Sequence, residues 1–573
     1  MNDGIPLTAH PTGAALDGLE VRLRGPAYDT LTALRAARAN RGVVTADDEV
    51  RIAARMGLPK AAVHGTASYY ADLRDWQGAR LVRVCGGTAC FVASGGGRHV
   101  DEVARTLGVP VGGCAPDGSV SLQRVHCLGY CYTGPTALDG DQPRAGVDLA
   151  DQLSGRAEPK APDAPVKSAT EPTIVRGILG EEPDWQVWHR VLAESGAEAG
   201  AARVRAAAAR AGLRGRGGAG FPAARKWKAV AEARPELPAG PPRYVVANGD
   251  EGDPGSYIDR ILMERDPARL LVGLALAALA CGATRGYVYV RSEYPVAYAC
   301  VGRAIAEAYE HGHLGRDVHG SGVYLDIEVA MGAGSYVAGE ETSLLRSLSG
   351  LRGTVRPRPP FPVDYGLLGR PTAVNNVETL AALPAIVADG GAGYAERGWP
   401  PETGTIVVCL NERFRRPGAY EVELGTPLRD IVVGLGGGLE EGRRLRALQV
   451  GGPLGGFLGA NQLDIPLLES ALSAAGATLG HASMIAIDDQ VPPRALLRHV
   501  WEFGASESCG MCTPCREGTR HGASDPETAA RDNGLLDVMA TASLCPFGRR
   551  LPRVIRSLLR VYEAEFAGGA GLP

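Results

Sequence analysis

The stretch SCGMCTPCREGTR, residues 508–520, places three cysteines on one short turn: Cys509, Cys512 and Cys515. Three thiolates at this spacing suit three corners of a [4Fe–4S] cubane, whereas a structural zinc site more often uses two separated Cys-x2-Cys pairs. A cubane needs a fourth thiolate, commonly distant and followed by proline, and Cys545 precedes Pro546. We therefore predict that these four cysteines, the C-terminal cysteine set, hold a [4Fe–4S] cluster, with a zinc site or free thiols as alternatives.

A second group of cysteines lies near the N-terminus. Cys85 and Cys90 are separated by four residues, and Cys127 and Cys131 by three. Two thiolate pairs from two loops are what a [2Fe–2S] rhomb requires, two for each iron. Glycines beside both pairs would let backbone amides approach the sulfurs. We predict that this N-terminal cysteine set binds a [2Fe–2S] cluster; the alternative is a zinc ribbon, whose pairs are more often Cys-x2-Cys.

The other four cysteines fall outside both sets. Cys281, Cys300 and Cys409 lie in apolar segments, and we expect them to be small residues of the buried core. Cys114 lies in the loop sequence VGGCAPDGS, near the second pair of the N-terminal set. We expect Cys114 to be incidental, with a role as substitute ligand left open.

Charge and hydropathy exclude several classes of protein. The net charge of −4 argues against a nucleic-acid-binding protein, which would carry a basic face. The sequence begins without a basic stretch followed by an apolar run, so we expect no signal peptide. The longest apolar run, residues 270–283, is shorter than the roughly 20 residues of a membrane-spanning helix. We therefore expect a cytoplasmic protein without membrane insertion, whose reduced thiols favour metal binding over disulfides.

The chain divides into a small and a large unit. Segment 154–173 is rich in proline and poor in large apolar residues, which predicts a flexible linker that fixes no geometry. Helical patterns precede a small α/β unit, and strands and helices alternate after the linker. The predicted fold is multidomain α/β. The predicted domains are a helical arm with the small α/β domain (1–150), the linker (151–173), a large α/β domain (174–400), a β-grasp domain (401–475) and a helical domain (476–573).

Four loops of the large unit indicate a nucleotide site. GLRGRGGAGFPAARKW (212–227) combines glycines with basic side chains, as an anion nest does, although it follows a helix rather than a strand. NGDEGDPGS (248–256) carries acids that suit either a divalent cation or flavin and ribose donors. MGAGSYVAGEETSLLRSL (331–348) leads into a helix with an acidic first turn, and TAVNNVETL (372–380) pairs two amides. Beside two iron–sulfur sites, these loops point to a flavin and a nicotinamide nucleotide.

The large unit resembles the NADH-oxidising flavoprotein subunit of respiratory complex I and of soluble NAD-linked formate dehydrogenases and hydrogenases. Besides the four loops, the resemblance rests on PRPPFP (357–362), ESCGMCTPCREGTR (507–520) and SLCPFG (543–548). The small unit resembles the thioredoxin-like [2Fe–2S] partner of that enzyme through VHGTASYY (63–70) and its cysteine pairs. The fusion of both units is more similar to the diaphorase part of a soluble hydrogenase or formate dehydrogenase than to complex I.

The resemblance implies FMN and NAD(H) in addition to the two clusters, and hydride transfer that needs no catalytic side chain. For FMN it implies Gly215, Arg216, Gly217, Lys226, Asn248, Asp250, Glu251, Tyr336, Gly339, Glu340, Val374, Asn375, Asn376 and Thr379. For NAD(H) it implies Phe221, Asp253, Glu341, Arg358 and Phe361. Asp253 and Arg358 stand where the family usually has Glu and Lys.

The implied activity is that of an NADH dehydrogenase, or diaphorase. It would transfer hydride between NAD(H) and FMN and pass single electrons through both clusters to or from a partner. The favoured partner is the catalytic subunit of a soluble NAD-dependent formate dehydrogenase, with further iron–sulfur subunits. The alternatives are an NAD-reducing or electron-bifurcating hydrogenase and the NADH-input subunit of complex I. A zinc-stabilised assembly subunit is the alternative from a different class.

Overall fold

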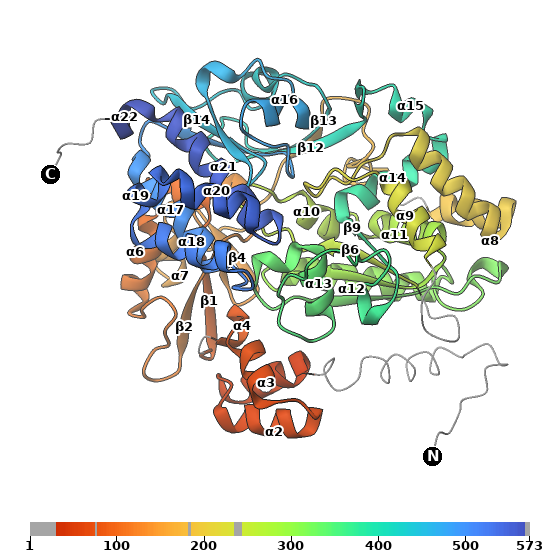
Figure 1. Ribbon diagram of the computed structural model, residues 1–573, viewed down its shortest axis with the longest axis horizontal. Helices are drawn as coiled ribbons and strands as arrows, with labels where there is room; N and C mark the ends of the chain where they lie inside the picture. The colour runs from red at the N-terminus through yellow and green to blue at the C-terminus, as the bar shows by residue number, and fades with distance from the viewer. Residues whose placement is uncertain (1–29, 75–76, 182–184, 234–242, 568–573) are drawn as a thin grey trace.

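The computed structural model describes residues 30–74, 77–181, 185–233 and 243–567. Figure 1 shows the helical arm at the bottom, the central α/β sheet towards the right, the β-grasp sheet at the top and the C-terminal helices at the left. Within the described residues, every helix is too short or too polar to span a bilayer.

A helical arm precedes the first sheet. It consists of residues 30–41 and the helices α2 (Ala46–Met56), α3 (Lys60–Ala67) and α4 (Ala71–Arg74). Its side chains reach backbone carbonyls of the central domain: Tyr69 Oη donates to Gly353 O (2.7 Å), and Arg35 Nη2 donates to Gly332 O (2.7 Å). The arm therefore supports a loop of the predicted nucleotide site.

The small α/β domain is built on a sheet of strand order β2-β1-β3-β4. Strands β1 and β2 are parallel, and β3 is antiparallel to β1. Because parallel strands end at the same edge of a sheet, the residues that follow β1 and β2 lie together. The elements are β1 (Arg80–Cys85), α5 (Thr88–Ala93), α6 (Arg98–Leu107), β2 (Val120–Val125), η1 (Cys131–Thr133), β3 (Thr136–Asp139), β4 (Gln142–Ala145) and α7 (Leu149–Leu153).

The central domain holds a parallel sheet of order β8-β7-β6-β9. Helix α11 is buried from Arg269 to Cys281, as its apolar run predicts. Helices on such a sheet leave the carboxyl ends of the strands free for ligand-binding loops. The elements are α8 (Trp185–Arg210), α9 (Ala223–Glu232), β6 (Arg243–Gly249), α10 (Ile258–Arg265), α11 (Pro267–Cys281), β7 (Ala283–Val290), α12 (Pro295–Glu310), η2 (Val318–Gly320), β8 (Asp326–Met331), η3 (Tyr336–Gly339), α13 (Glu341–Leu348), η4 (Leu367–Gly369), β9 (Thr372–Asn376), α14 (Val377–Asp389) and α15 (Ala392–Ala395).

A six-stranded sheet of order β15-β14-β16-β12-β13-β5 forms the β-grasp domain. One face of this sheet packs on its own apolar cluster, which includes Phe414, Leu428 and Leu472. The elements are β5 (Val166–Ser168), β10 (Gly398–Trp399), β11 (Glu402–Thr403), β12 (Thr405–Leu410), β13 (Gly418–Glu423), η5 (Asp430–Leu435), β14 (Leu445–Val450), β15 (Gly456–Gly459), η6 (Ala460–Gln462), α16 (Glu469–Ala474) and β16 (Ser483–Asp488).

The segment predicted as a flexible linker is instead part of this sheet. Strand β5 lies inside the segment and pairs in parallel with β13. The carboxylate of Glu421, on β13, accepts hydrogen bonds from the backbone N atoms of Thr173, Ile174 and Val175 at 3.0–3.2 Å. Composition could not reveal this, because the contacts are made by the backbone rather than by apolar side chains.

The C-terminal domain is helical, as expected. Helix α18 begins directly after Cys512, and α21 begins directly after Cys545. Three helices fill the connection between these two cysteines and pack around the buried Trp501 and Met539. The elements are α17 (Pro493–Glu507), α18 (Thr513–Ser524), α19 (Pro526–Arg531), α20 (Asn533–Ala542), α21 (Pro546–Val561) and α22 (Glu563–Ala567).

Replacing Glu421 with alanine tests the anchoring of the linker segment. Glu421→Ala leaves three buried N–H groups without an acceptor, so we expect unfolding free energy to fall by about 3 kcal/mol or more. Urea unfolding followed by circular dichroism measures the change. Glu423→Ala, two residues along the same strand and half-buried, is the control and should cost clearly less. Equal losses in both variants would contradict the anchoring role.

Candidate active site and cysteine clusters

The structure brings the four N-terminal cysteines into one buried pocket. Cys85 ends β1 and Cys127 follows β2, so the sheet edge places them together, and the Sγ atoms of Cys127 and Cys131 lie 3.7 Å apart. A hydrogen bond from the Cys90 thiol lowers the pKa of Cys85 to about 7, whereas the pKa of Cys131 is raised by Cys127. Four mutually close thiols fit a cluster whose iron ions hold them as thiolates.

Backbone amides surround this N-terminal set. Gly129 N donates to Cys127 Sγ (3.3 Å), and Gly255 N donates to Cys131 Sγ (3.2 Å). Gly255 belongs to the acidic loop 248–256 of the central domain. Its φ of 100° and a distance of 2.9 Å from an added Cβ to Ile485 Cγ1 leave room only for glycine. The loop predicted to hold the flavin therefore also contacts the N-terminal cysteines.

The remaining cysteines have different environments. Cys281 and Cys409 are fully buried in the core, as predicted. Cys300 is only half-buried on α12, where Arg303 Nη2 donates to its sulfur (3.1 Å), so the core prediction is wrong for this residue. Cys114 bridges to Ser121 at the start of β2, whereas the N-terminal set lies beyond the ends of β1 and β2. Cys114 therefore lies too far away to replace a ligand.

The C-terminal cysteine set is also brought together, with Cys545 joining the other three against Phe503 and Phe547. Burial raises the pKa of Cys515 and of Cys545 to about 12. The N-termini of α18 and α21 begin at this set, and helix N-termini stabilise negative charge. Buried thiols that face two helix N-termini fit an anionic iron–sulfur cluster.

The four loops predicted to form the nucleotide site meet at the carboxyl edge of the central sheet. Asn248 Nδ2 donates to Gly339 O (2.9 Å), which joins the loop after β6 to the loop after β8. Lys226 Nζ donates to Val374 O (2.8 Å) and lies 3.7 Å from Glu341 Oε2. These contacts connect segments that are far apart in the sequence into one cradle, the nucleotide cradle.

Two carboxylates in the nucleotide cradle have an oxygen without a hydrogen-bond donor. Asp250 Oδ2 and Glu340 Oε1 are shielded from solvent and have no hydrogen-bond partner among the described residues, although Arg358 Nη2 lies 3.5 Å from Glu340 Oε1. Burial raises the pKa of both groups. A buried acceptor without a donor is costly, so it indicates a ligand that carries N–H or O–H groups. The isoalloxazine ring and ribityl chain of FMN offer both kinds of donor, so these residues fit FMN.

Several predicted flavin residues hold the loops through their own side chains. Arg216 Nη2 donates to Tyr394 Oη (2.9 Å), and its backbone N donates to Thr379 Oγ1 (2.9 Å). Asn375 Oδ1 accepts from Trp227 Nε1 (3.0 Å). These side chains are therefore engaged within the protein and stabilise the shape of the cradle.

A similar role falls to Asn376, Gly215 and Gly217. Asn376 caps α14, since its Oδ1 accepts from Thr379 N (3.2 Å). Gly215 N donates to Phe221 O (3.0 Å), which closes the first loop on itself. An added Cβ on Gly217 would lie 2.9 Å from Asn376 Cβ, so the first and fourth loops can meet only at a glycine.

Glu251 is fully buried and caps a helix. Its carboxylate accepts from Ser256 Oγ (2.8 Å) and from the backbone N atoms of Asp259 (3.1 Å) and Arg260 (3.0 Å) at the start of α10. Its backbone oxygen accepts from Arg291 Nη1 (2.7 Å). Glu251 therefore fixes loop 248–256 rather than offering a free carboxylate.

Tyr336 connects the nucleotide cradle to the C-terminal cysteine set. Its Oη donates to Asp253 Oδ1 (2.6 Å), and its backbone N donates to Glu507 Oε2 (3.0 Å). Its ring lies 5.1 Å from that of Phe503 and 5.7 Å from that of Phe547, both of which pack against the cysteines. A predicted NAD(H) residue and a predicted flavin residue thus lie beside the C-terminal set.

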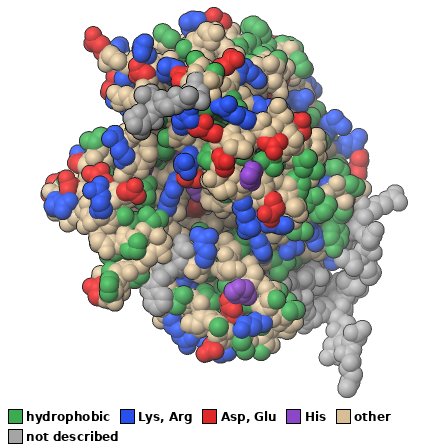
Figure 2. Space-filling model, turned by 60° about the vertical axis from the view of Figure 1, so that its left-hand side comes forward, with side chains coloured by type: hydrophobic (Ala, Val, Ile, Leu, Met, Phe, Trp, Pro, Cys, Tyr) green, Lys and Arg blue, Asp and Glu red, His purple; other side chains and the backbone are tan. Residues whose placement is uncertain are grey.

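The other predicted NAD(H) residues border the cradle. Phe221 and Phe361 are 46% and 48% exposed, which is unusual for phenylalanine and leaves their rings available for stacking. Arg358 Nη1 pairs with Glu341 Oε1 at 2.6 Å. On the face drawn in Figure 2, Lys and Arg side chains gather around the middle of the molecule, where they would attract phosphate groups.

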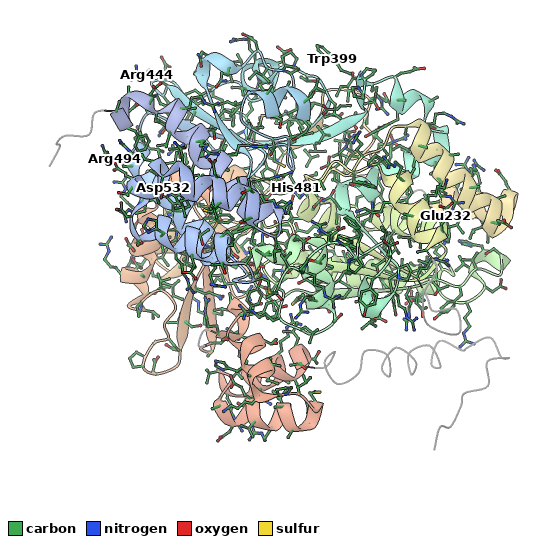
Figure 3. All side chains as sticks on the ribbon, in the orientation of Figure 1. Glu232, Trp399, Arg444, His481, Arg494 and Asp532 are labelled. Atoms are coloured by element: carbon green, nitrogen blue, oxygen red, sulfur yellow. The ribbon has the colours of Figure 1, made fainter. Side chains whose placement is uncertain are left out.

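His481, from the β-grasp domain, was not identified from the sequence. Figure 3 places it near the centre of the molecule. Its Nδ1 lies 3.4 Å from Ser256 Oγ, and its Nε2 would lie 3.2 Å from a Cβ on Gly217. No local pattern marks this histidine, because only the packing of two domains brings it to the cradle.

Three family comparisons match successive parts of the chain. Residues 21–148 match the thioredoxin-like [2Fe-2S] ferredoxin family, residues 208–385 the Nuo51 FMN-binding domain, and residues 495–568 the NADH-ubiquinone oxidoreductase-F iron-sulfur binding region. The matched segments contain both cysteine sets and the loops of the nucleotide cradle.

Individual relatives agree with these matches. An F-type component of the NADH-quinone oxidoreductase of Rhizobium meliloti (strain 1021) is 41% identical over 62% of this chain and 85% of its own length. NADP-reducing hydrogenase subunit HndC of Solidesulfovibrio fructosivorans is 37% identical over 62% of this chain and 74% of its own length. The crystal structure of an air-oxidized NAD+-reducing [NiFe]-hydrogenase superposes with a TM-score of 0.82 and 30% identity, covering 96% of both chains.

The fold, the two cysteine sets and the nucleotide cradle define an iron–sulfur flavoprotein. The chain belongs to the family of NADH-oxidising flavoprotein subunits that includes the F-type component of NADH-quinone oxidoreductase. It is an NADH dehydrogenase of the diaphorase type, and its cofactors are FMN, NAD(H), a [2Fe–2S] cluster and a [4Fe–4S] cluster. The zinc alternatives, including the assembly subunit, are not supported.

Replacing Cys545 with serine tests the fourth ligand of the C-terminal set. Cys545→Ser should abolish the electron paramagnetic resonance signal of the reduced [4Fe–4S] cluster, because only three thiolates remain. Reduction of bound flavin by NADH, followed by absorbance, should persist. Cys300→Ser, which changes a cysteine far along the chain from either set, should retain the signal. A cubane that survives in Cys545→Ser would show that another group is the fourth ligand.

Asp250 tests the flavin assignment. Asp250→Ala removes a buried acceptor, so we expect FMN to bind about tenfold more weakly or worse, since 1.4 kcal/mol corresponds to a factor of about ten. Flavin content after dilution and gel filtration measures the loss. Asp364→Ala, at an exposed position, is the control. Full flavin retention in Asp250→Ala would exclude contact between Asp250 and FMN.

Proposed function

We propose that this chain is the NAD(H)-handling subunit of a larger enzyme and exchanges single electrons with a partner through both clusters. The observation that carries the proposal is loop 248–256. Its Asp250 lies in the nucleotide cradle, its Asp253 accepts from Tyr336, and its Gly255 donates to Cys131. One short loop therefore contacts the predicted flavin site, the predicted NAD(H) site and one cysteine set.

The protein's own residues would bind, orient and shield the cofactors. Bound FMN would supply the conversion between hydride and single electrons. Asp250 and Glu340 offer buried acceptors that would fix its orientation. The aromatic rings of Tyr336, Phe503 and Phe547 form a dry contact between the cradle and the C-terminal set. This arrangement supports the C-terminal set as the first electron acceptor.

The kind of partner is the finer part of the proposal. The sequence favours a formate dehydrogenase catalytic subunit, which stays a prediction. The NADH-quinone oxidoreductase relative aligns with 62% of this chain, whereas the chain of the NAD+-reducing [NiFe]-hydrogenase aligns with 96%. The shared fusion supports a hydrogenase-type assembly over a complex I-type assembly. A cytoplasmic location, the domain boundaries and the ligand residues also stay predictions.

Isolation of the assembly tests this proposal. The chain, tagged and purified with its partners, should contain flavin and about six iron atoms for its own two clusters, two plus four. Nickel in the assembly would indicate a hydrogenase, and molybdenum or tungsten a formate dehydrogenase. NADH should reduce ferricyanide in either case. Zinc without flavin would contradict the diaphorase proposal, and quinone reduction by a membrane-bound assembly would favour complex I.

A further inference from the structure

Four of the 11 histidines of the chain gather at one end of the molecule. His189 lies on α8, and His311, His313 and His319 lie in the segment that follows α12. Figure 1 shows α8 at the right-hand end, opposite the C-terminal helices that carry the [4Fe–4S] ligands. This histidine cluster belongs to neither the nucleotide cradle nor the cysteine sets.

Two of these imidazoles already have the spacing of metal ligands. His313 Nδ1 and His319 Nε2 lie 3.1 Å apart. Two nitrogens bound to one tetrahedral ion at typical Zn–N lengths are about 3.3 Å apart. At this contact, at least one of the two nitrogens carries a lone pair rather than a proton. The pair therefore presents a ligand edge to an incoming cation.

His189 supplies the third imidazole. The ring centroids of His189 and His319 are 5.0 Å apart, and those of His313 and His319 are also 5.0 Å apart. Imidazoles that share a tetrahedral ion have centroids about 5.2 Å apart, given the same bond lengths. His189 is exposed, so its ring can turn towards the pair. His311 is a weaker candidate, since its Nδ1 lies 2.8 Å from Glu307 O.

The backbone holds the pair in this arrangement. His319 has a φ of 52° and Asp317 a φ of 50°, in the left-handed region that residues other than glycine rarely occupy. Such outliers concentrate at ligand clamps and switch regions. Trp188 Nε1 donates to His313 O (3.1 Å), and the Trp185 ring stacks on the His313 ring at 4.3 Å with an interplanar angle of 5°. The two imidazoles are therefore fixed before any ion arrives.

We propose that His313, His319 and His189 form a surface site for a divalent transition-metal ion of the Zn²⁺ or Ni²⁺ type. Imidazole nitrogens suit these ions, and water would complete the coordination shell. A bound ion would link the start of α8 to the segment after α12. The site is independent of the proposed function, because none of its residues contributes to the electron path.

Titration of the purified holoprotein with Ni²⁺ or Zn²⁺ tests the site. Calorimetry should show one saturable ion per chain. His313→Ala and His319→Ala should each weaken binding at least about tenfold, the lower bound found even for partners outside a ligand shell. His189→Gln, which alters an exposed ring and leaves the fold intact, should weaken it by a smaller but measurable factor. His521→Gln, at an exposed histidine on α18, is the matched control and should bind like the wild type.

The stacked tryptophan provides a second readout. Ni²⁺ should quench part of the tryptophan fluorescence, and Trp185→Phe should remove this quenching while calorimetric binding persists. Iron content and NADH–ferricyanide activity should stay constant during the titration, which shows that the ion does not attack the clusters. The absence of a saturable ion, or wild-type affinity in both His313→Ala and His319→Ala, would overturn the proposal. The 3.1 Å contact would then be a hydrogen bond between neutral imidazoles.

Discussion

The buried carboxylate of Glu251 is the interaction on which the arrangement of the redox groups depends. It caps α10 through two backbone N–H groups and holds Ser256 at the far end of the same loop. Arg291 and Tyr294 fix its backbone oxygen from the other side. A loop held at both ends and in its middle has little freedom. The distance between the nucleotide cradle and the N-terminal cysteine set is therefore set by one side chain that contacts neither a cysteine nor a surface.

The two cysteine sets are stabilised in different ways. The N-terminal set lies at the edge of a sheet, where backbone amides of Gly129 and Gly255 point at the sulfurs. The C-terminal set lies at the N-termini of α18 and α21, so helix dipoles act on it. Hydrogen bonds to sulfur and local charge both tune the potential of an iron–sulfur cluster. The same metal chemistry is thus placed in two electrostatic settings within one chain.

Sequence patterns predicted the parts of this structure that depend on local spacing. Cys-x2-Cys-x2-Cys and the Cys-Pro that follows are recognisable because thiolates must surround a cluster closely, and the apolar run of α11 is recognisable because the helix is buried on all sides. The cap made by Glu251, the approach of His481 and the exclusion of Cys114 depend on contacts between distant segments. Sequence alone assigns Glu251 to a ligand because an acid in a glycine loop looks the same in either role.

Strand β5 changes how the two fused units relate to each other. Because it joins the β-grasp sheet, the segment between the units acts as a fixed strap and not as a free tether. A covalent connection already replaces a bimolecular encounter by an intramolecular one, and a rigid connection raises the effective concentration further by removing unproductive orientations. In a fused chain of this kind, the [2Fe–2S] unit cannot exchange with that of another molecule. Every flavin is matched to its own pair of clusters, and electron transfer between them does not depend on protein concentration.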